Sequence, residues 1–153
     1  MEHIKDTLKR KLKHHQIRAT SIRLDILALF HNSSFALSHA DVTAGLPAET
    51  DRVTIYRTLT TFLAQGLIHK ISDDSNTAKY ALCSGDNCHG GHHEDQHLHF
   101  RCSICCHTFC IEPVQIPSIS LPLGYNLQNI TMTAEGVCQD CNSQDERYKE
   151  KIS

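Results

Sequence analysis

The spacing of apolar residues along the chain changes near residue 66. Before that point apolar residues recur every three or four positions, which is the period of one face of an α-helix. This spacing predicts four helices. The first lies near residues 4–12, the second covers about 21–31, the third begins at Ser38 and the fourth begins at Asp51. The inward residues expected of the second helix are Ile22, Ile26, Leu29 and Phe30.

Polar residues and glycine mark the ends of the third and fourth helices. Ser38 and Asp41 have nearly the spacing of a capping box, and Pro47 is expected to end that helix. Asp51 can cap the fourth helix, and Gly66 stands where a glycine commonly follows a helix C-terminus. The buried stripe expected of the fourth helix is Ile55, Leu59, Phe62 and Leu63.

Short apolar runs after Gly66 predict strands. Residues 67–71 and 79–82 flank the polar turn 73–76 and predict a two-stranded hairpin. Helices followed by a hairpin are the element order of a winged helix-turn-helix domain. Further strands are expected at 98–102, 108–114 and 127–133. The chain is therefore predicted to have four parts. They are the winged helix-turn-helix domain at 1–82, a linker rich in possible metal ligands at 83–97, a small second module at 98–142 and a charged tail at 143–153.

Charge separates the same two modules. The 153 residues carry a formal net charge of −2, which excludes a uniformly basic nucleic-acid-binding chain. Residues 1–70 nevertheless hold 10 Lys and Arg against 6 Asp and Glu, whereas residues 71–153 hold 5 against 11. No apolar run reaches the roughly 18 residues of a membrane helix, and the basic N-terminus lacks the apolar segment of a signal peptide. We therefore expect a cytoplasmic protein without a membrane partner.

Cysteine and histidine are unusually frequent, with eight cysteines, all from Cys83 onward, and twelve histidines. In a cytoplasmic chain, paired cysteines favour metal binding or redox chemistry over structural disulfides. Four thiolates from two Cys-x-x-Cys pairs form a closed tetrahedral site that suits Zn²⁺. The alternative is a thioredoxin-like redox pair, which needs a βαβ setting that the pattern does not show. The ligands expected of a structural Zn²⁺ are Cys102, Cys105, Cys138 and Cys141.

A second metal site is expected where the two modules join. In the segment 97–99 both histidines face one side of a strand, because side chains alternate along it. A set of imidazoles with one thiolate favours Zn²⁺ over Fe²⁺ or Mn²⁺. The alternatives are a solvated histidine-rich linker and, for His69, a side chain that only packs. The expected ligands are His69, Cys83, His97 and His99, with Cys88 and Cys110 as substitutes. Cys110 would otherwise be a small buried apolar residue.

Several motifs, taken in order, resemble the ferric uptake regulator family. They are RATSIRLDIL at 18–27, TIYRTL at 54–59 with GLI at 66–68, HLH at 97–99 and the two Cys-x-x-Cys pairs. The resemblance covers roughly residues 5–142 and implies an α+β chain. Its parts would be a winged-helix DNA-binding domain, a zinc-stapled α/β dimerisation domain and a regulatory metal at the hinge. It also implies that Tyr56 and Arg57 of the recognition helix contact DNA.

Within that family, the hinge ligands resemble those of the zinc uptake regulator branch. Iron and peroxide sensors usually carry a histidine at the position of Ala36 and an acidic ligand at the position of Cys110. The resemblance therefore implies a second, regulatory Zn²⁺, with Fe²⁺ as the alternative.

The expected function is a metal-responsive, zinc-sensing transcriptional repressor of metal-uptake genes, acting as a homodimer on a double-stranded DNA operator. The recognition helix would enter the major groove while basic residues bind phosphate. The residues expected at DNA are Tyr56, Arg57, Arg52, Thr54, Arg18 and Arg23. The alternatives are an iron-responsive repressor, a zinc-storage or metallochaperone protein, and a thiol oxidoreductase. No catalytic triad, phosphate loop or pair of catalytic carboxylates is evident, so no catalysis is expected.

Overall fold

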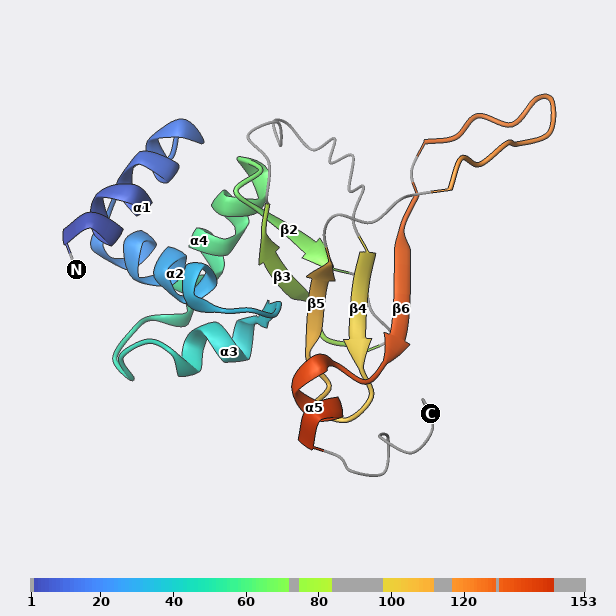
Figure 1. The fold of residues 1–153 in the computed structure, drawn as a ribbon. Helices are drawn as coiled ribbons and strands as arrows, with labels where there is room; N and C mark the ends of the chain where they lie inside the picture. Colours follow the sequence, from blue (N-terminus) through green and yellow to red (C-terminus); the bar gives the residue numbers. More distant parts are fainter. Residues whose placement is uncertain (1, 72–74, 84–97, 112–116, 129, 145–153) are drawn as a thin grey trace. The chain divides into compact units, whose positions relative to one another are not determined.

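The computed structural model describes residues 2–71, 75–83, 98–111, 117–128 and 130–144 (Figure 1). The chain divides into two compact units, Met1–Glu94 and Asp95–Ser153. This division falls inside the predicted linker 83–97, and the finer predicted boundaries stay a prediction. No helix in the described part of the chain is long and apolar enough to cross a membrane.

In the described residues, the first unit contains four helices and a small sheet, and the second contains a three-stranded sheet and one short helix (Figure 1). The elements of the first unit are α1 (Glu2–His14), α2 (Ser21–Asn32), β1 (Leu37–Ser38), α3 (His39–Ala44), α4 (Arg52–Ala64), β2 (Ile68–Ile71) and β3 (Lys79–Leu82). The elements of the second unit are β4 (Leu98–Cys102), β5 (Thr108–Ile111), β6 (Met132–Gly136) and α5 (Gln139–Gln144). The predicted α+β class is confirmed.

One apolar core holds the first unit together and includes residues from all four helices. Helix α2 buries Leu24 and Leu27 as well as the expected Ile26 and Phe30. Ile22 and Leu29, which were also expected inside, are only half-buried at the edge of the core. Leu24 and Leu27 are buried in addition because α2 contacts both α1 and β3, so its buried face is wider than a single stripe.

The predicted helix caps of α3 and α4 are confirmed. The Ser38 hydroxyl accepts the Asp41 N–H at 3.2 Å, and the Asp41 carboxylate accepts the Ser38 N–H at 2.8 Å, which completes a capping box. The Asp51 carboxylate accepts the Thr54 N–H at 3.0 Å. Helix α3 ends at Ala44, before the expected stop at Pro47, and the N–H of the next residue, Gly45, donates to the carbonyl groups of Asp41 and Thr43.

Gly66 turns the chain from α4 directly into β2. Its φ of 66° lies in the left-handed region, which glycine adopts without steric cost. The Leu67 N–H donates to the Phe62 carbonyl at 2.9 Å and the Gly66 N–H donates to the Leu63 carbonyl at 3.1 Å, which is the Schellman pattern of a helix end. The wing strands therefore begin at a defined angle to the helix that precedes them.

The sheet of the first unit has the order β1-β3-β2, and both pairings are antiparallel. The predicted hairpin is confirmed, with Ile68 opposite Leu82 and Ile71 opposite Lys79. Strand β1 has only two residues and gave no signal in the sequence pattern. Helices followed by this sheet form the predicted winged helix-turn-helix fold.

The sheet of the second unit has the order β5-β4-β6, with β4 antiparallel to β5 and parallel to β6. The strand predicted at 127–133 was wrong in its bounds, because β6 runs from Met132 to Gly136. The parallel register places Gly136 opposite Cys102, and a side chain at Gly136 would begin 3.1 Å from the Phe100 ring. The bounds of β6 are therefore set by its pairing with β4 and not by the apolar pattern of the preceding residues. The end of the strand predicted at 108–114 lies outside the described residues.

Candidate functional site

Two cysteine pairs come together in the second unit, at the ends of β4 and β6. The sulfur atoms of Cys102, Cys105, Cys138 and Cys141 all lie within 4.8 Å of one another. The Cys105 and Cys138 sulfurs are 3.8 Å apart. A tetrahedral Zn²⁺ site with Zn–S bonds of about 2.3 Å has sulfur–sulfur edges of about 3.8 Å. The donor set and its dimensions therefore fit Zn²⁺.

Backbone hydrogen bonds position this cysteine cluster. Cys102 is the last residue of β4, and the Cys106 N–H donates to the Cys102 carbonyl at 3.0 Å to close the turn. The Ser103 N–H donates to the Gly136 carbonyl at 2.8 Å and ties this turn to the end of β6. Cys141 of the second pair lies in α5, a short helix that the sequence pattern did not predict.

Electrostatics prepare one of the four thiols for metal binding. Burial raises the pKa of Cys102, but backbone N–H groups of Cys138, Cys105 and Ile104 outweigh this effect and lower the pKa to about 6. The nitrogens of Cys138 and Ile104 each lie 3.4 Å from the Cys102 sulfur. Burial raises the pKa of Cys141 to about 12. Four thiolates therefore do not coexist without a cation, and metal binding must release protons.

A histidine and a cysteine lie together in the sheet of the first unit. The His69 Nδ1 is 3.6 Å from the Cys83 sulfur, and both residues are buried. Cys83 follows β3 and donates its N–H to the Leu67 carbonyl at 3.1 Å. Because Leu67 and His69 are two positions apart on the neighbouring strand, His69 and Cys83 are diagonal neighbours on one face.

A second histidine–cysteine pair lies in the sheet of the second unit. His99 on β4 is directly opposite Cys110 on β5, and side chains opposite each other in an antiparallel pair point to the same face. His99 is buried and Cys110 is half-buried. This pairing was not predicted from the sequence, although counting outward from the turn between the two strands would have matched the two residues. His97 and Cys88 lie outside the described residues.

Helix α4 presents one stripe of side chains to solvent. Val53, Tyr56, Arg57 and Thr60 are all exposed and follow the i, i+3, i+4, i+7 spacing of a single helix face. Tyr56 is 65% exposed, whereas Ile55 on the opposite face is fully buried. Val53 and Thr60 were not singled out in the sequence, but the same helical period places them beside the two expected residues.

The other residues expected at DNA differ in their surroundings. Arg18 and Arg52 are exposed, and Arg23 is half-buried with its guanidinium donating to the Arg18 carbonyl at 2.9 Å. The Thr54 hydroxyl donates to the Asp51 carboxylate at 3.1 Å, so it belongs to the cap of α4. Hydrogen bonds from Thr54, first from its N–H, lower the pKa of Asp51.

Sequence comparisons relate this chain to metal-uptake regulators. The model of the "Ferric uptake regulator family" matches residues 14–135. A ferric uptake regulation protein of Bordetella parapertussis is 30% identical over 139 residues, which cover 86% of this chain and 94% of the relative. A zinc uptake regulation protein of Escherichia coli is 29% identical over 136 residues, which cover 82% of this chain and 73% of the relative.

Solved structures agree with the fold. A zinc uptake regulator complexed with zinc and DNA has a TM-score of 0.63 at 20% identity, covering 94% of this chain and 95% of that one. The Helicobacter pylori ferric uptake regulator has a TM-score of 0.56 at 16% identity, covering 92% of this chain and 93% of that one. At these identities the likeness establishes the fold only.

The cysteine cluster predicts that the second unit unfolds when its metal is lost. Cys102→Ser removes one of four ligands, so we expect loss of about one equivalent of bound zinc, measured by elemental analysis, together with loss of the sheet signal in circular dichroism. Cys106→Ser is the matched control, because Cys106 is exposed in the same turn but outside the cluster. A Cys102→Ser protein that keeps its zinc and its fold would contradict the assignment.

Proposed function

Because the chain belongs to the ferric uptake regulator family, a family of metal-responsive transcription regulators, we propose that it represses metal-uptake genes in response to zinc. One observation carries the proposal. Each unit holds a histidine–cysteine pair, His69 with Cys83 and His99 with Cys110, in addition to the four-cysteine cluster. A structural metal needs only the cluster, so two further pairs of donors point to a second, regulatory metal.

The chemistry of these donors favours zinc as the regulatory metal. Two thiolates and two imidazoles form a borderline-soft set that suits Zn²⁺, whereas carboxylate and water ligands suit Mn²⁺ and related ions. The antiparallel register supports Cys110 as the fourth ligand, and His97 stays a candidate from the sequence. The iron-responsive alternative is supported by the Bordetella parapertussis relative, which is named a ferric uptake regulation protein. The four-cysteine cluster would hold the structural Zn²⁺.

We propose that one regulatory ion takes ligands from both pairs. Such an ion would restrict the two units to fewer relative orientations, because it would be bonded to donors on each of them. Metal then shifts the population toward a DNA-binding state by binding that state more tightly. The coupling is reciprocal, so operator DNA should also raise the affinity for zinc.

The exposed stripe of α4 is the proposed reading surface for operator DNA. Tyr56 and Arg57 offer the phenol and guanidinium groups that contact base edges, and Val53 offers an apolar surface for a thymine methyl group. The excess of basic over acidic residues in residues 1–70 supplies an attraction for phosphate that does not depend on sequence.

We propose that the second unit forms a homodimer. Its buried side chains among the described residues are only His99, Cys102, Thr108 and Cys138, and the apolar core cluster lies entirely in the first unit. Residues 113–134 hold no charged side chain. Residues 117–128 lie within this stretch and form a loop without helix or strand (Figure 1). Every second residue from Ile119 to Leu127 is a large apolar residue that is exposed. These residues are Ile119, Leu121, Leu123, Tyr125 and Leu127. A second copy would remove this surface from water.

Substitutions on the α4 stripe test the DNA surface. Tyr56→Ala and Arg57→Ala should each weaken operator binding by about 1–3 kcal/mol, because each removes a base contact without touching the core. Fluorescence anisotropy with labelled operator measures this loss, and elemental analysis should show unchanged zinc. Arg101→Ala in the second unit removes the same charge away from α4 and serves as the control. Unchanged affinity in both α4 variants would remove the stripe from the interface.

The metal preference tests zinc against iron. Zn²⁺ should restore operator binding to the chelator-treated protein at a far lower free concentration than Fe²⁺ or Mn²⁺. Cys83→Ser, Cys110→Ser and His99→Ala should each abolish that response while the structural zinc remains, and Cys106→Ser should not. If Fe²⁺ activates as well as Zn²⁺ and the Cys83→Ser and Cys110→Ser variants respond normally, the iron-responsive alternative replaces the zinc proposal.

Charge in the apolar loop tests the dimer. The double substitution Leu121→Asp with Leu123→Asp should convert the dimer to monomer in sedimentation equilibrium, because it would place two carboxylates in a buried interface. Ser118→Asp with Ser120→Asp adds the same charge at the alternate positions of the same loop and should leave the dimer intact. A dimer that survives the leucine substitutions would exclude this loop from the interface.

A further inference from the structure

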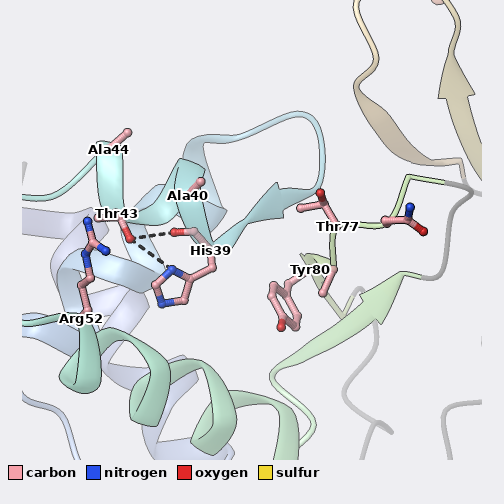
Figure 2. A pocket seen from close by; sticks show the side chains of 9 residues that line it. His39, Ala40, Thr43, Ala44, Arg52, Thr77 and Tyr80 are labelled. Atoms are coloured by element: carbon pink, nitrogen blue, oxygen red, sulfur yellow. Dashed lines mark hydrogen bonds between the residues drawn. The ribbon is translucent and has the colours of Figure 1, made fainter.

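A hollow of about 690 Å³ opens on the first unit between α3, the first turn of α4 and the segment that leads into β3 (Figure 2). None of the cysteines or histidines considered as metal ligands lines it, and neither do Tyr56 and Arg57. The hollow is therefore separate from the histidine–cysteine pairs and from the exposed stripe of α4.

The lining of the hollow combines an apolar floor with a polar rim. Ala40, Ala44 and Ala78 provide small apolar surfaces. The rim carries hydrogen-bond donors, and Figure 2 shows Arg52 and His39 on the side of the helices and Tyr80 and Thr77 on the side of β3. A hollow with this lining can accept a ligand that has both an apolar face and an anionic oxygen.

No carboxylate is among the described residues that line the hollow, and the described acids next to them in sequence, Asp41 and Asp51, are engaged elsewhere. Asp41 accepts the Ser38 N–H at 2.8 Å and the Ser38 hydroxyl at 2.6 Å. Asp51 accepts the N–H and the hydroxyl of Thr54 at 3.0 and 3.1 Å. Both carboxylates are therefore held in helix caps, and Arg52 is the one residue with a formal charge among the described lining residues.

Arg52 is available for a ligand. It is the first residue of α4 and is exposed, and its guanidinium makes no hydrogen bond or ion pair with the described part of the chain. His39 is held at the wall by Thr43, whose hydroxyl lies 2.8 Å from the His39 carbonyl and 3.3 Å from its Nδ1 (Figure 2). A guanidinium binds phosphate with two parallel hydrogen bonds, which a fixed wall beside it helps to orient.

We propose that this hollow binds one deoxyribose-phosphate unit of the operator backbone, with the phosphate on Arg52 and the sugar against the alanine floor. The inference rests on the proposed function and adds a site to it. The hollow is open to solvent, which suits a segment of a continuous polymer better than a small ligand that must be largely enclosed. Because Arg52 precedes the reading stripe on the same helix, the bound phosphate sets the register of α4 in the major groove.

The test uses the full-length protein and operators that carry a single neutral methylphosphonate at each backbone position in turn. For the wild type, one such position should weaken binding about tenfold, and in Arg52→Ala that position should make no further difference. Arg52→Ala should also reduce the slope of log affinity against log salt concentration by about 0.9, the value for one phosphate.

A matched pair of variants tests the floor of the hollow. Ala40→Glu places a carboxylate there and should weaken binding to the unmodified operator about tenfold, whereas Ala40→Gln adds the same bulk without charge and should weaken it less. Ala40 is exposed on α3, so both variants should fold. Equal effects of the two substitutions would overturn the anionic character of the ligand.

Inorganic phosphate distinguishes a backbone phosphate from a free anion. If phosphate competes with the operator only when Arg52 is present, and no methylphosphonate position couples to Arg52, the hollow is a free-anion site and the inference is wrong. A wild type that fails to bind the operator under any metal condition contradicts the proposed function itself. Operator binding that depends on Tyr56 but shows no coupling to Arg52 contradicts only this inference.

Discussion

The fold of the second unit depends on four sulfur atoms. Its described residues bury almost no apolar side chains, so burial alone cannot offset the conformational entropy that the unit loses on folding. The cysteine cluster joins the ends of β4 and β6 with the start of α5, which are the points where a three-stranded sheet of this size would otherwise fray. The proposed structural metal would then be a condition of folding, as it is in other small metal-stapled domains.

The first unit is held together by buried apolar side chains. A continuous apolar core includes all four helices, and α4 has one face in that core and the other in solvent. Caps at Asp51 and Gly66 set where α4 begins and where the wing follows it. A rigid helix with a defined exposed stripe is suited to reading DNA, because its side chains are held in position before the partner arrives.

The regulatory proposal depends on donors that are placed on strands of both sheets. His69 with Cys83, and His99 with Cys110, are set by strand register, so each pair is already arranged within its own unit. A metal that uses both pairs has only the orientation of the units left to determine. Ligands that are already arranged within each unit are what a metal-dependent switch requires.

The sequence by itself determined the features that depend on local chemistry. Helical spacing, the caps at Ser38 and Asp51 and the turn at 73–76 were enough to predict the helices, the hairpin and the α+β class, because each depends on neighbouring residues. The motifs around Tyr56 and the two cysteine pairs were enough to identify the family. Tertiary structure alone decided the bounds of β6 and the hollow beside Arg52. Those features depend on strand register and on the packing of elements far apart in the chain, which local periodicity does not encode.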